Sequence, residues 1–417
     1  MKKIIASASL VAVGAAGLQG ANAPGLTRTQ TSKPWSVSAS LRGFYDDNYA
    51  TAPSGSDQDQ DSYGFEVSPM ASINLPWQQS YLGASYRYSM KYYDDREKNS
   101  ADHTHLVNIK GDHRFSERYD VFLDESFVYA QEPELVEPGG SPIRSNADAF
   151  RNHVKVGFNA RLTELVGVGL SYYNGWYDYD DEGPGSRSAV LDRFEHLINL
   201  DGRYQMRETI AALAGYQFGM VNYNDDELLF DPNYSLDPTE KSDIRDSTSH
   251  YFYVGADGEL SAKVLVSSRI GVQYTDFDDL DEDSVTPYIN NTLTYSYLPG
   301  SYFQIGVTHR RNATDVAGTT GDVVTDQEST SIYGQVRHRI TPKLTGTLLI
   351  QGQFSEFNEG EYDGDKDKFL LLGANLDYEI NQFLAAEAGY NLDRLDSDLP
   401  DRSFTRNRVY LGLRASY

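Results

Sequence analysis

The sequence predicts an all-β protein, a transmembrane antiparallel up-and-down β-barrel of about 18 strands with short periplasmic turns and long acidic external loops. Segments of about ten residues alternate apolar and polar positions, which is the period of a strand with two unlike faces. Tight turns and long acidic connections join these segments in alternation, as the two rims of an outer-membrane barrel require. After residue 23, no segment has the run of about 18 apolar residues that a spanning helix needs.

Residues 1–23 are predicted to be a secretory signal peptide. Lys2 and Lys3 precede an apolar stretch, and Ala21-Asn22-Ala23 offers a small-x-small cleavage site, although Pro24 would then follow the cleaved bond. The alternative, a structural helix, would have to explain an apolar segment without a polar face. Residues 24–34 would form a short periplasmic segment and residues 35–417 the barrel, which leaves no room for a folded N-terminal plug.

Composition excludes several classes of function. With 36 Lys and Arg against 61 Asp and Glu, the net charge of −25 argues against nucleic acid as a partner. There is no cysteine, and therefore no disulfide, thiol nucleophile or cysteine-based metal site. The 31 tyrosines suit a membrane interface, where one end of the ring is apolar and the other is hydrated.

The C-terminal strands set the expected faces most clearly. Leu370, Leu372 and Leu376 share one face of a strand, and Leu411 and Leu413 share one face of the last. We expect these five leucines to face lipid. The chain stops on Tyr417, an aromatic residue at the end of a strand, and this predicts recognition by the barrel assembly machinery.

Eighteen strands need 17 connections, and the sequence offers eight tight turns and nine longer loops. An even number of strands places both termini on the periplasmic side. A soluble β-sandwich is the alternative, but its loops would not sort by length to one end. The strands are expected to begin near Ser36, Gly64, Tyr81, Thr104, Asp120, Arg151, Val166, Leu191, Thr209, Tyr251, Leu265, Val285, Tyr302, Thr330, Thr345, Phe369, Leu384 and Thr405.

The C-terminal part of the chain contains several distinctive motifs. They are Tyr378-Glu379-Ile380-Asn381-Gln382-Phe383, Gly389-Tyr390-Asn391-Leu392, Asp396-Ser397-Asp398, Arg406-Asn407-Arg408-Val409-Tyr410-Leu411-Gly412-Leu413 and the turn Thr341-Pro342-Lys343-Leu344. These motifs resemble those of the putative beta-barrel porin family, type 2. The resemblance implies an outer-membrane barrel and no catalytic residues. It also implies a part in polysaccharide export, because such barrels are often found near exopolysaccharide loci.

Acidic loops are the first candidates for chemistry, because carboxylates at this density could bind divalent cations. The EF-hand pattern fails, since Ser62 and Lys368 occupy the position that needs glycine. We therefore expect solvated loops, no defined metal site and no cofactor, with loosely held divalent ions bridging to lipopolysaccharide. The loop carboxylates are Asp57, Asp59, Asp61, Asp276, Asp278, Asp279, Asp281, Glu282, Asp283, Asp363, Asp365 and Asp367.

Catalysis is not predicted. The sequence lacks G-x-S-x-G, H-E-x-x-H and the P-loop pattern. His103 and His105 lie beside Asp102 near the external end of a strand, where outer-membrane hydrolases place such groups. Both rings would point to one face of the strand, and we expect no enzyme.

The inward faces of the strands carry the candidate pore-lining residues. A cluster of Arg42, Arg406 and Arg408 is expected where the first and last strands meet, offset by Glu387 and Asp393. Two hypotheses stay open: these arginines attract anions, or they only pair with carboxylates and stiffen the seam. The pore-lining candidates are Arg42, Arg87, Arg337, Arg339, Glu387, Asp393, Arg406, Arg408 and Arg414.

Together these patterns predict an outer-membrane channel for small polar solutes, with lipid and lipopolysaccharide as surroundings. The alternative is an accessory barrel in exopolysaccharide export or surface attachment without a free pore. A line of inward aromatic rings would favour sugars, because rings stack on sugar faces. Candidate rings are Tyr173, Tyr177, Tyr253, Tyr288, Tyr333 and Tyr410.

Overall fold

A computed structural model describes residues 33–417, except residue 98 and segments 131–147, 225–226, 232–238 and 319–321. The predicted signal peptide lies outside the described residues. The strands are β1 (Trp35–Asp46), β2 (Ser62–Pro76), β3 (Ser80–Tyr93), β4 (Ala101–Arg114), β5 (Tyr119–Ala130), β6 (Ala149–Arg161), β7 (Val166–Tyr179), β8 (Arg193–Arg207), β9 (Ile210–Tyr223), β10 (Ser247–Ser261), β11 (Val264–Phe277), β12 (Asp283–Leu298), β13 (Ser301–Asn312), β14 (Asp326–Arg339), β15 (Leu344–Asn358), β16 (Lys366–Glu379), β17 (Leu384–Ser397) and β18 (Phe404–Ser416).

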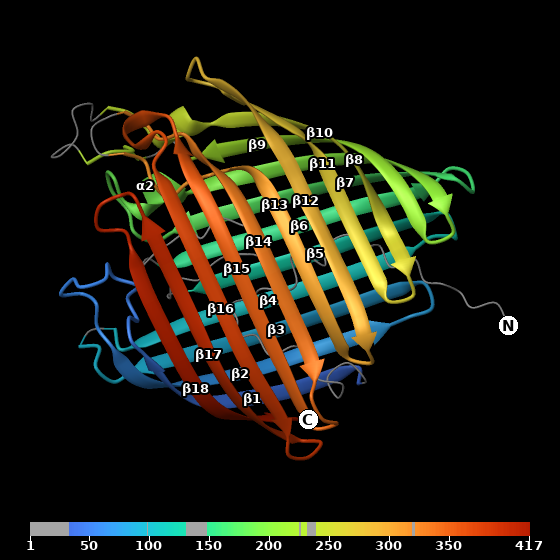
Figure 1. The fold of residues 1–417 in the computed structure, drawn as a ribbon, viewed down its shortest axis with the longest axis horizontal. Coiled ribbons are helices and arrows are strands. Elements are labelled where there is room, and N and C mark those ends of the chain that lie inside the picture. Colours follow the sequence, from blue (N-terminus) through green and yellow to red (C-terminus); the bar gives the residue numbers. More distant parts are fainter. Residues whose placement is uncertain (1–32, 98, 131–147, 225–226, 232–238, 319–321) are drawn as a thin grey trace.

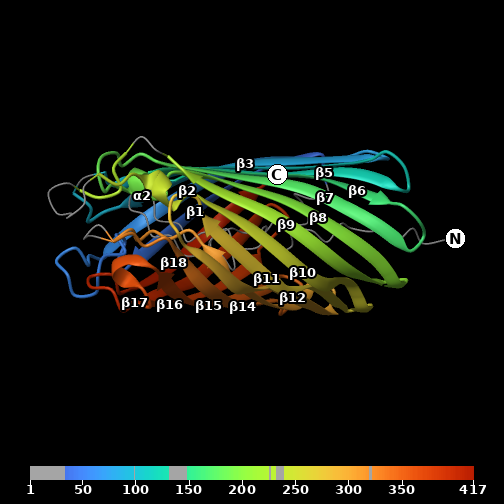
Figure 2. The ribbon, with the colours of Figure 1, turned by 90° about the horizontal axis from the view of Figure 1, so that it is seen from above.

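These strands form one closed antiparallel barrel, as predicted. Each strand pairs with the next along the chain, and β1 pairs with β18 from Ser38↔Ser416 to Asp46↔Arg408. Beyond the ladder, the amide of Tyr417 donates to the carbonyl of Val37 at 2.8 Å. Closure leaves no edge with unpaired backbone groups, which hydrocarbon would not tolerate. Figures 1 and 2 show a flattened barrel whose long loops gather at one end and whose tight turns gather at the other.

The predicted strand starts are accurate at one rim and less so at the other. After tight turns they fall within one residue of the observed starts, whereas at the external rim they miss by one to four. Tyr251 and Thr330, for example, lie four residues beyond the observed first residues of β10 and β14. At the external rim the strands extend beyond the apolar band with mostly polar residues. The alternation of apolar and polar residues therefore does not mark where these strands begin. Leu191 ends a short helix instead of starting a strand.

The lipid-facing prediction is confirmed at the C-terminal strands. Leu411 is 69% exposed, Leu370, Leu376 and Leu413 are also exposed, and Leu372 lies on the same face of β16. Aromatic side chains form an exposed belt beside the tight turns, as expected for a membrane interface. This belt comprises Trp35, Trp77, Tyr81, Phe115, Tyr119, Tyr204, Tyr295, Tyr378, Phe383 and Tyr417.

Several external loops pack together over the barrel mouth. The β7–β8 loop contains helix α2 (Arg187–Leu191), and the β9–β10 loop contains the 3-10 helix η1 (Ser242–Arg245). Their apolar residues form a cluster with Tyr177 of β7 and with Ala317 of the β13–β14 loop. The preceding residue, Val316, belongs to a second cluster with Phe357 of β15. Because β7 and β15 lie eight strands apart in an 18-stranded barrel, the β13–β14 loop crosses the mouth. We call these packed loops the cap.

Among the residues that the structure describes, no helix has the length and apolar character needed to cross a membrane.

Candidate channel lining and its external cap

The nine predicted pore-lining residues all lie on the inward face of their strands. Along β1, Ser36, Ser40, Arg42 and Asp46 are buried, whereas Val37 and Leu41 at alternate positions are exposed. The same alternation places the other candidates inward. They lie on β3 (Arg87), β14 (Arg337, Arg339), β17 (Glu387, Asp393) and β18 (Arg406, Arg408, Arg414).

At the seam, Arg42 joins three strands through its guanidinium group. Its Nη2 lies 2.8 Å from Oε2 of Glu387 on β17, and its Nη1 lies 3.6 Å from Glu66 on β2. To reach β17, the side chain passes over Gly412 of β18, where a Cβ would lie 2.6 Å from Cγ of Arg42. Arg414 extends the network with a 2.6 Å contact to Glu387. A glycine in β18 therefore makes room for an ion pair between β1 and β17.

Arg406 has a different partner from the one that the sequence suggested. Its Nε donates to both carboxylate oxygens of Asp46 at 3.0 Å, and both side chains are fully buried. Asp393 lies opposite Arg406 in the β17–β18 register, and Asp46 lies opposite Arg408 in the β1–β18 register. Sequence reasoning missed Asp46 because it looks like the start of an acidic loop. Its place in the inward alternation of β1 was the signal that could have revealed it.

The charges of Arg42 and Arg406 are thus balanced by buried carboxylates. This geometry matches the structural hypothesis for the seam: pairing stiffens the closure, and no surplus positive charge of these two residues faces the lumen. Removing one partner of such a buried pair costs about 3–5 kcal/mol, because the other charge stays buried.

Inward tyrosines use glycines in the same way as Arg42. Tyr410 of β18 lies over Gly389 of β17 and donates to Oδ1 of Asn375 on β16 at 2.7 Å. Tyr253 of β10 lies over Gly215 of β9 and donates to Asp201 of β8 at 2.8 Å. A Cβ at either glycine would lie 2.3 Å from the tyrosine ring. Tyr333, Gly306 and Thr292 repeat the arrangement on β14, β13 and β12.

These contacts leave the tyrosine rings little access to solutes. Five of the six candidate rings are each at most 8% exposed, namely Tyr177, Tyr253, Tyr288, Tyr333 and Tyr410, and the sixth, Tyr173, is half-buried. Tyr253 and Tyr288 lie 5.6 Å apart between ring centroids, and the other three of these five lie on different parts of the wall. The described rings therefore do not form an open aromatic track.

At the external end of β6 to β9, arginines alternate with tyrosines. Arg151, Tyr177, Arg193 and Tyr223 lie opposite one another in register, and Arg245 of the cap continues the row. The guanidinium of Arg193 lies 3.9 Å from the ring centroid of Tyr177, and that of Arg245 lies 4.2 Å from Tyr223. These distances are within cation–π range. Sequence periodicity could not find this row, because Arg245 belongs to a loop.

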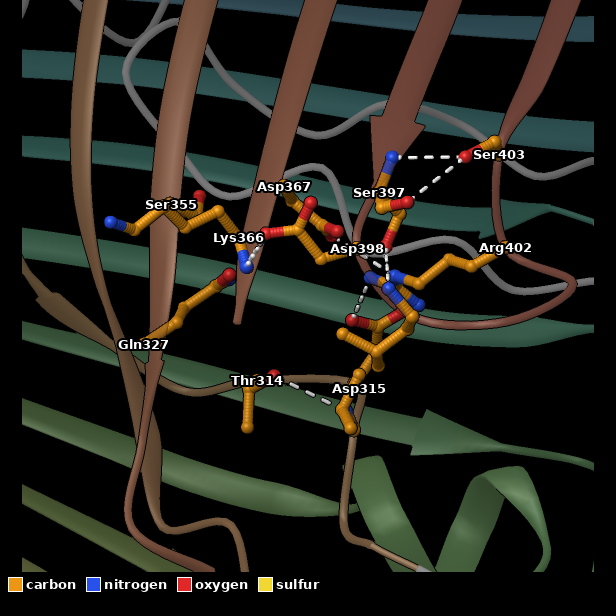
Figure 3. A network of polar contacts seen from close by, with 12 residues as sticks. Thr314, Asp315, Gln327, Ser355, Lys366, Asp367, Ser397, Asp398, Arg402 and Ser403 are labelled. Carbon is orange, nitrogen blue, oxygen red and sulfur yellow. Dashed lines mark hydrogen bonds and ion pairs between the residues drawn. The ribbon is translucent and has the colours of Figure 1, made fainter. Parts of the chain in front are cut away.

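An ion-pair network fastens the cap to the β17–β18 loop (Figure 3). Nη1 and Nη2 of Arg402 donate to the two carboxylate oxygens of Asp315 at 3.0 and 2.8 Å, and its Nε donates to Asp367 at 3.0 Å. Burial by itself would raise the pKa of Asp315, but the Arg402 guanidinium outweighs burial and holds that pKa below its ordinary value. Asp315 begins the segment that crosses the mouth, so Arg402 acts as a latch.

The two histidines considered for catalysis and the neighbouring Asp102 lie on opposite faces of β4. His103 and His105 face outward and contact the hydroxyls of Tyr88 and Tyr86 at 2.7 and 2.9 Å. Asp102 points to the opposite face and binds Arg96 at 2.7 Å. Across the described parts of the chain, no group of three or more His, Asp or Glu side chains could hold a metal ion.

A closed barrel with an apolar exterior, an aromatic belt and a charged interior defines an outer-membrane β-barrel protein. The family model described as "Putative beta-barrel porin 2" matches residues 36–417, and the chain belongs to that family. The resemblance seen in the C-terminal motifs is therefore confirmed. No curated protein matches the chain in sequence.

Solved structures of other outer-membrane barrels are similar only distantly. A BenF-like porin from Pseudomonas fluorescens Pf-5 has 12% identity and a TM-score of 0.47, with 92% of this chain and 99% of that chain covered. OccK9 (OpdG) from Pseudomonas aeruginosa has 11% identity and a TM-score of 0.47, with 92% of this chain and 98% of that chain covered. The siderophore receptor PirA from the same species has 10% identity and a TM-score of 0.40, with 91% of this chain and 80% of that chain covered. Likeness at this level carries no argument about solute or mechanism.

Proposed function

We propose that this chain is a porin-like channel for small polar solutes, narrowed at its external mouth by the cap. The observation that carries the proposal is the chemistry of the inner wall, which is polar where the outer wall is apolar. Besides the ion pairs, small hydroxyl and amide side chains line the wall. They include Ser36, Ser40, Ser68, Ser72, Gln273, Thr275, Gln304, Ser329, Ser331, Gln351, Gln353 and Ser355.

The rival function is an accessory barrel for exopolysaccharide export or attachment, without a free pore. Sugar passage would be favoured by exposed aromatic faces along the lumen. The covered tyrosines offer little such surface, so the geometry supports the channel for small solutes better.

Single-channel recording on the purified, refolded protein in planar bilayers tests the proposal. We expect discrete conductance steps, which the heat-unfolded protein does not give. Liposome swelling adds a size test: a pentose such as arabinose should enter, and a trisaccharide such as raffinose should enter far more slowly. Absence of both conductance and swelling, with the barrel shown to be folded by its resistance to SDS at room temperature, would favour the accessory barrel.

Export and assembly belong to the same proposal. We infer that residues 1–23 direct export, that the assembly machinery recognises the strand ending at Tyr417, and that lipopolysaccharide surrounds the external rim. Changing Tyr417 to Ser should lower the amount of assembled barrel in the outer membrane. The control Tyr378→Ser, at the same rim on β16, should not. Equal assembly of both variants and the native chain would contradict this role for Tyr417.

A further inference from the structure

Two arginines of the row at the external end of β6 to β9, Arg193 and Arg245, lie against helix α2. Arg193 is buried, and its Nε donates to Glu195 at 2.9 Å. Arg245 is 1% exposed and, among the described residues, forms no ion pair with a carboxylate. Burial lowers the pKa of Arg245, and the positive charge of Arg193 also lowers it, against opposing effects of Tyr223 and of the negative charge of Asp246 that are smaller than that of burial. A buried guanidinium that no carboxylate binds directly is costly, so its presence needs an explanation.

Helix α2 provides a backbone carbonyl acceptor to each of these two guanidinium groups. Arg193 Nη1 donates to the carbonyl of Leu191 at 2.8 Å, and Arg245 Nη2 donates to the carbonyl of Val190. The hydroxyl of Ser242 donates to the carbonyl of Ala189. The last carbonyls of a helix have no partner within the helix and carry its negative end. Adjacent carbonyl oxygens of α2 therefore lie where the oxygens of an anion would lie.

The nearby loop carboxylates do not serve this purpose. Asp246 accepts from the amide of Tyr223 at 2.7 Å and from the side chain of Asn222 at 3.1 Å. Asp192 accepts from the amide of Tyr179 at 2.8 Å and from Ser188 at 2.6 Å. Both acids accept hydrogen bonds from neutral donors, so Asp246 acts on Arg245 only through its charge and not as a hydrogen-bond acceptor.

A simpler reading is that the two arginines only cap α2. Neutral donors would then be enough to cap the helix, as the hydroxyl of Ser242 does at the carbonyl of Ala189. The simpler reading also leaves Nε and Nη1 of Arg245 buried without a hydrogen-bond acceptor. Unmet donors on a buried charged group favour a site whose natural occupant is an anion.

We propose that Arg193 and Arg245 form a binding site for a solute carrying a carboxylate, and that the carbonyls of α2 occupy this site when the cap is closed. The inference deepens the proposed channel function and rests on it. A carboxylate that displaces the carbonyls of Val190 and Leu191 would exchange neutral acceptors for a charged one and would add a counter-charge for the buried guanidinium groups. Binding and opening of the cap are thus coupled, and anions of this kind are favoured over neutral solutes at the mouth.

The test compares succinate with its neutral isostere succinamide on the folded, detergent-solubilised protein. Calorimetry measures binding directly, and bilayer recording measures the change in open probability and the ratio of chloride to potassium permeability. Arg245→Gln keeps the size and two donors of the side chain but removes its charge. Arg207→Gln removes the same charge from the exposed periplasmic end of β8 and serves as the matched control.

We expect succinate, and not succinamide, to bind and to raise open probability. Arg245→Gln should weaken succinate binding about tenfold, the loss typical of one charge-assisted hydrogen bond, while Arg207→Gln should not. Equal binding of succinamide, or unchanged binding in Arg245→Gln, would overturn the inference. If the native protein conducts no ions but binds succinate through Arg245, the channel proposal fails and the site stands. If it conducts ions without binding succinate, only the site fails.

Discussion

Single side chains hold this barrel closed and its mouth covered. Arg42 connects three strands across Gly412, Arg406 holds Asp46, and Arg402 fastens the crossing segment through Asp315. Each contact joins residues far apart in the sequence and buries charge on both sides. Because a buried ion pair is costly to break but is not always stabilising as a whole, its main effect is to fix which groups lie together.

The latch can be tested by changing Arg402 to Gln. The buried carboxylate of Asp315 then loses its counter-charge, and we expect the cap to open more often, with larger and noisier currents in planar bilayers. Adding Asp315→Asn to this variant should restore part of the closed time, because no charge then remains buried. Arg118→Gln, in an exposed periplasmic turn, is the control. Unchanged currents in Arg402→Gln would show that the cap does not narrow the channel.

The two faces of a strand should respond differently to the same substitution. Leu411→Arg places a charge on the lipid side and should lower the free energy of unfolding by about 2–4 kcal/mol. Asn375→Arg, on the inward face, should cost only about 1 kcal/mol, chiefly through the lost hydrogen bond from Tyr410. Urea titration of the protein in lipid vesicles measures both. Equal costs would mean that the assigned faces are wrong.

At the scale of elements, glycines of several strands admit large side chains from the neighbouring strands. Gly215, Gly306, Gly389 and Gly412 each lie beneath a Tyr or Arg that reaches a polar group two strands away. The device adds hydrogen bonds across three strands, beyond the backbone ladder. It also draws the rings against the wall, which keeps them out of the lumen.

Gly389→Ala tests this device. The new Cβ would lie 2.3 Å from the ring of Tyr410. Displacing the ring should cost about 1–3 kcal/mol, the usual range for overpacking. In a Tyr410→Ala background, the added cost of Gly389→Ala should become small. Gly352→Ala, where a Cβ would meet nothing within 4 Å, is the control. Thermal unfolding of all four variants measures the coupling, and strictly additive effects would contradict it.

At the scale of the whole molecule, the cap makes closure of the mouth depend on pH. Burial, helped by the negative charges of Asp178 and Glu227, raises the pKa of Asp192, at the end of α2, to about 6, although hydrogen bonds from Ser188 and Tyr179 oppose this rise. If the pKa of a carboxyl group is higher when the cap is closed than when it is open, the closed state binds more protons than the open state. The capped state therefore gains stability from Asp192 at low pH and loses it as pH rises through about 6.

Open probability should therefore increase between pH 5 and pH 7.5 in bilayer recordings. Asp192→Asn should stay near the low-pH behaviour and show a smaller change. Some pH dependence should persist, because burial also raises the pKa of Asp246 in the same loop cluster. A native channel that opens more as pH falls would contradict this account. So would an Asp192→Asn variant with the same pH response as the native chain.

The strand count, the faces and the inward position of all nine pore-lining candidates were predictable from the sequence. They follow from the local alternation of apolar and polar residues. In a membrane, closing the barrel is the only way to give the backbone groups of the first and last strands hydrogen-bond partners. The seam was predictable in part. Arg42 and Glu387 were expected to approach, since β1 must meet β18, but Asp46 was not among the candidates.

The sequence by itself determined the barrel, because a period of two and alternating turn lengths are properties of neighbouring residues. Only the tertiary structure decided which charges pair, how Ala317 comes to lie near α2, and that Arg245 completes a row begun by Arg151. These contacts depend on loops, which have no period, and on side chains that reach two strands across the wall. Their partners are set by register and closure, which exist only once the whole sheet has formed.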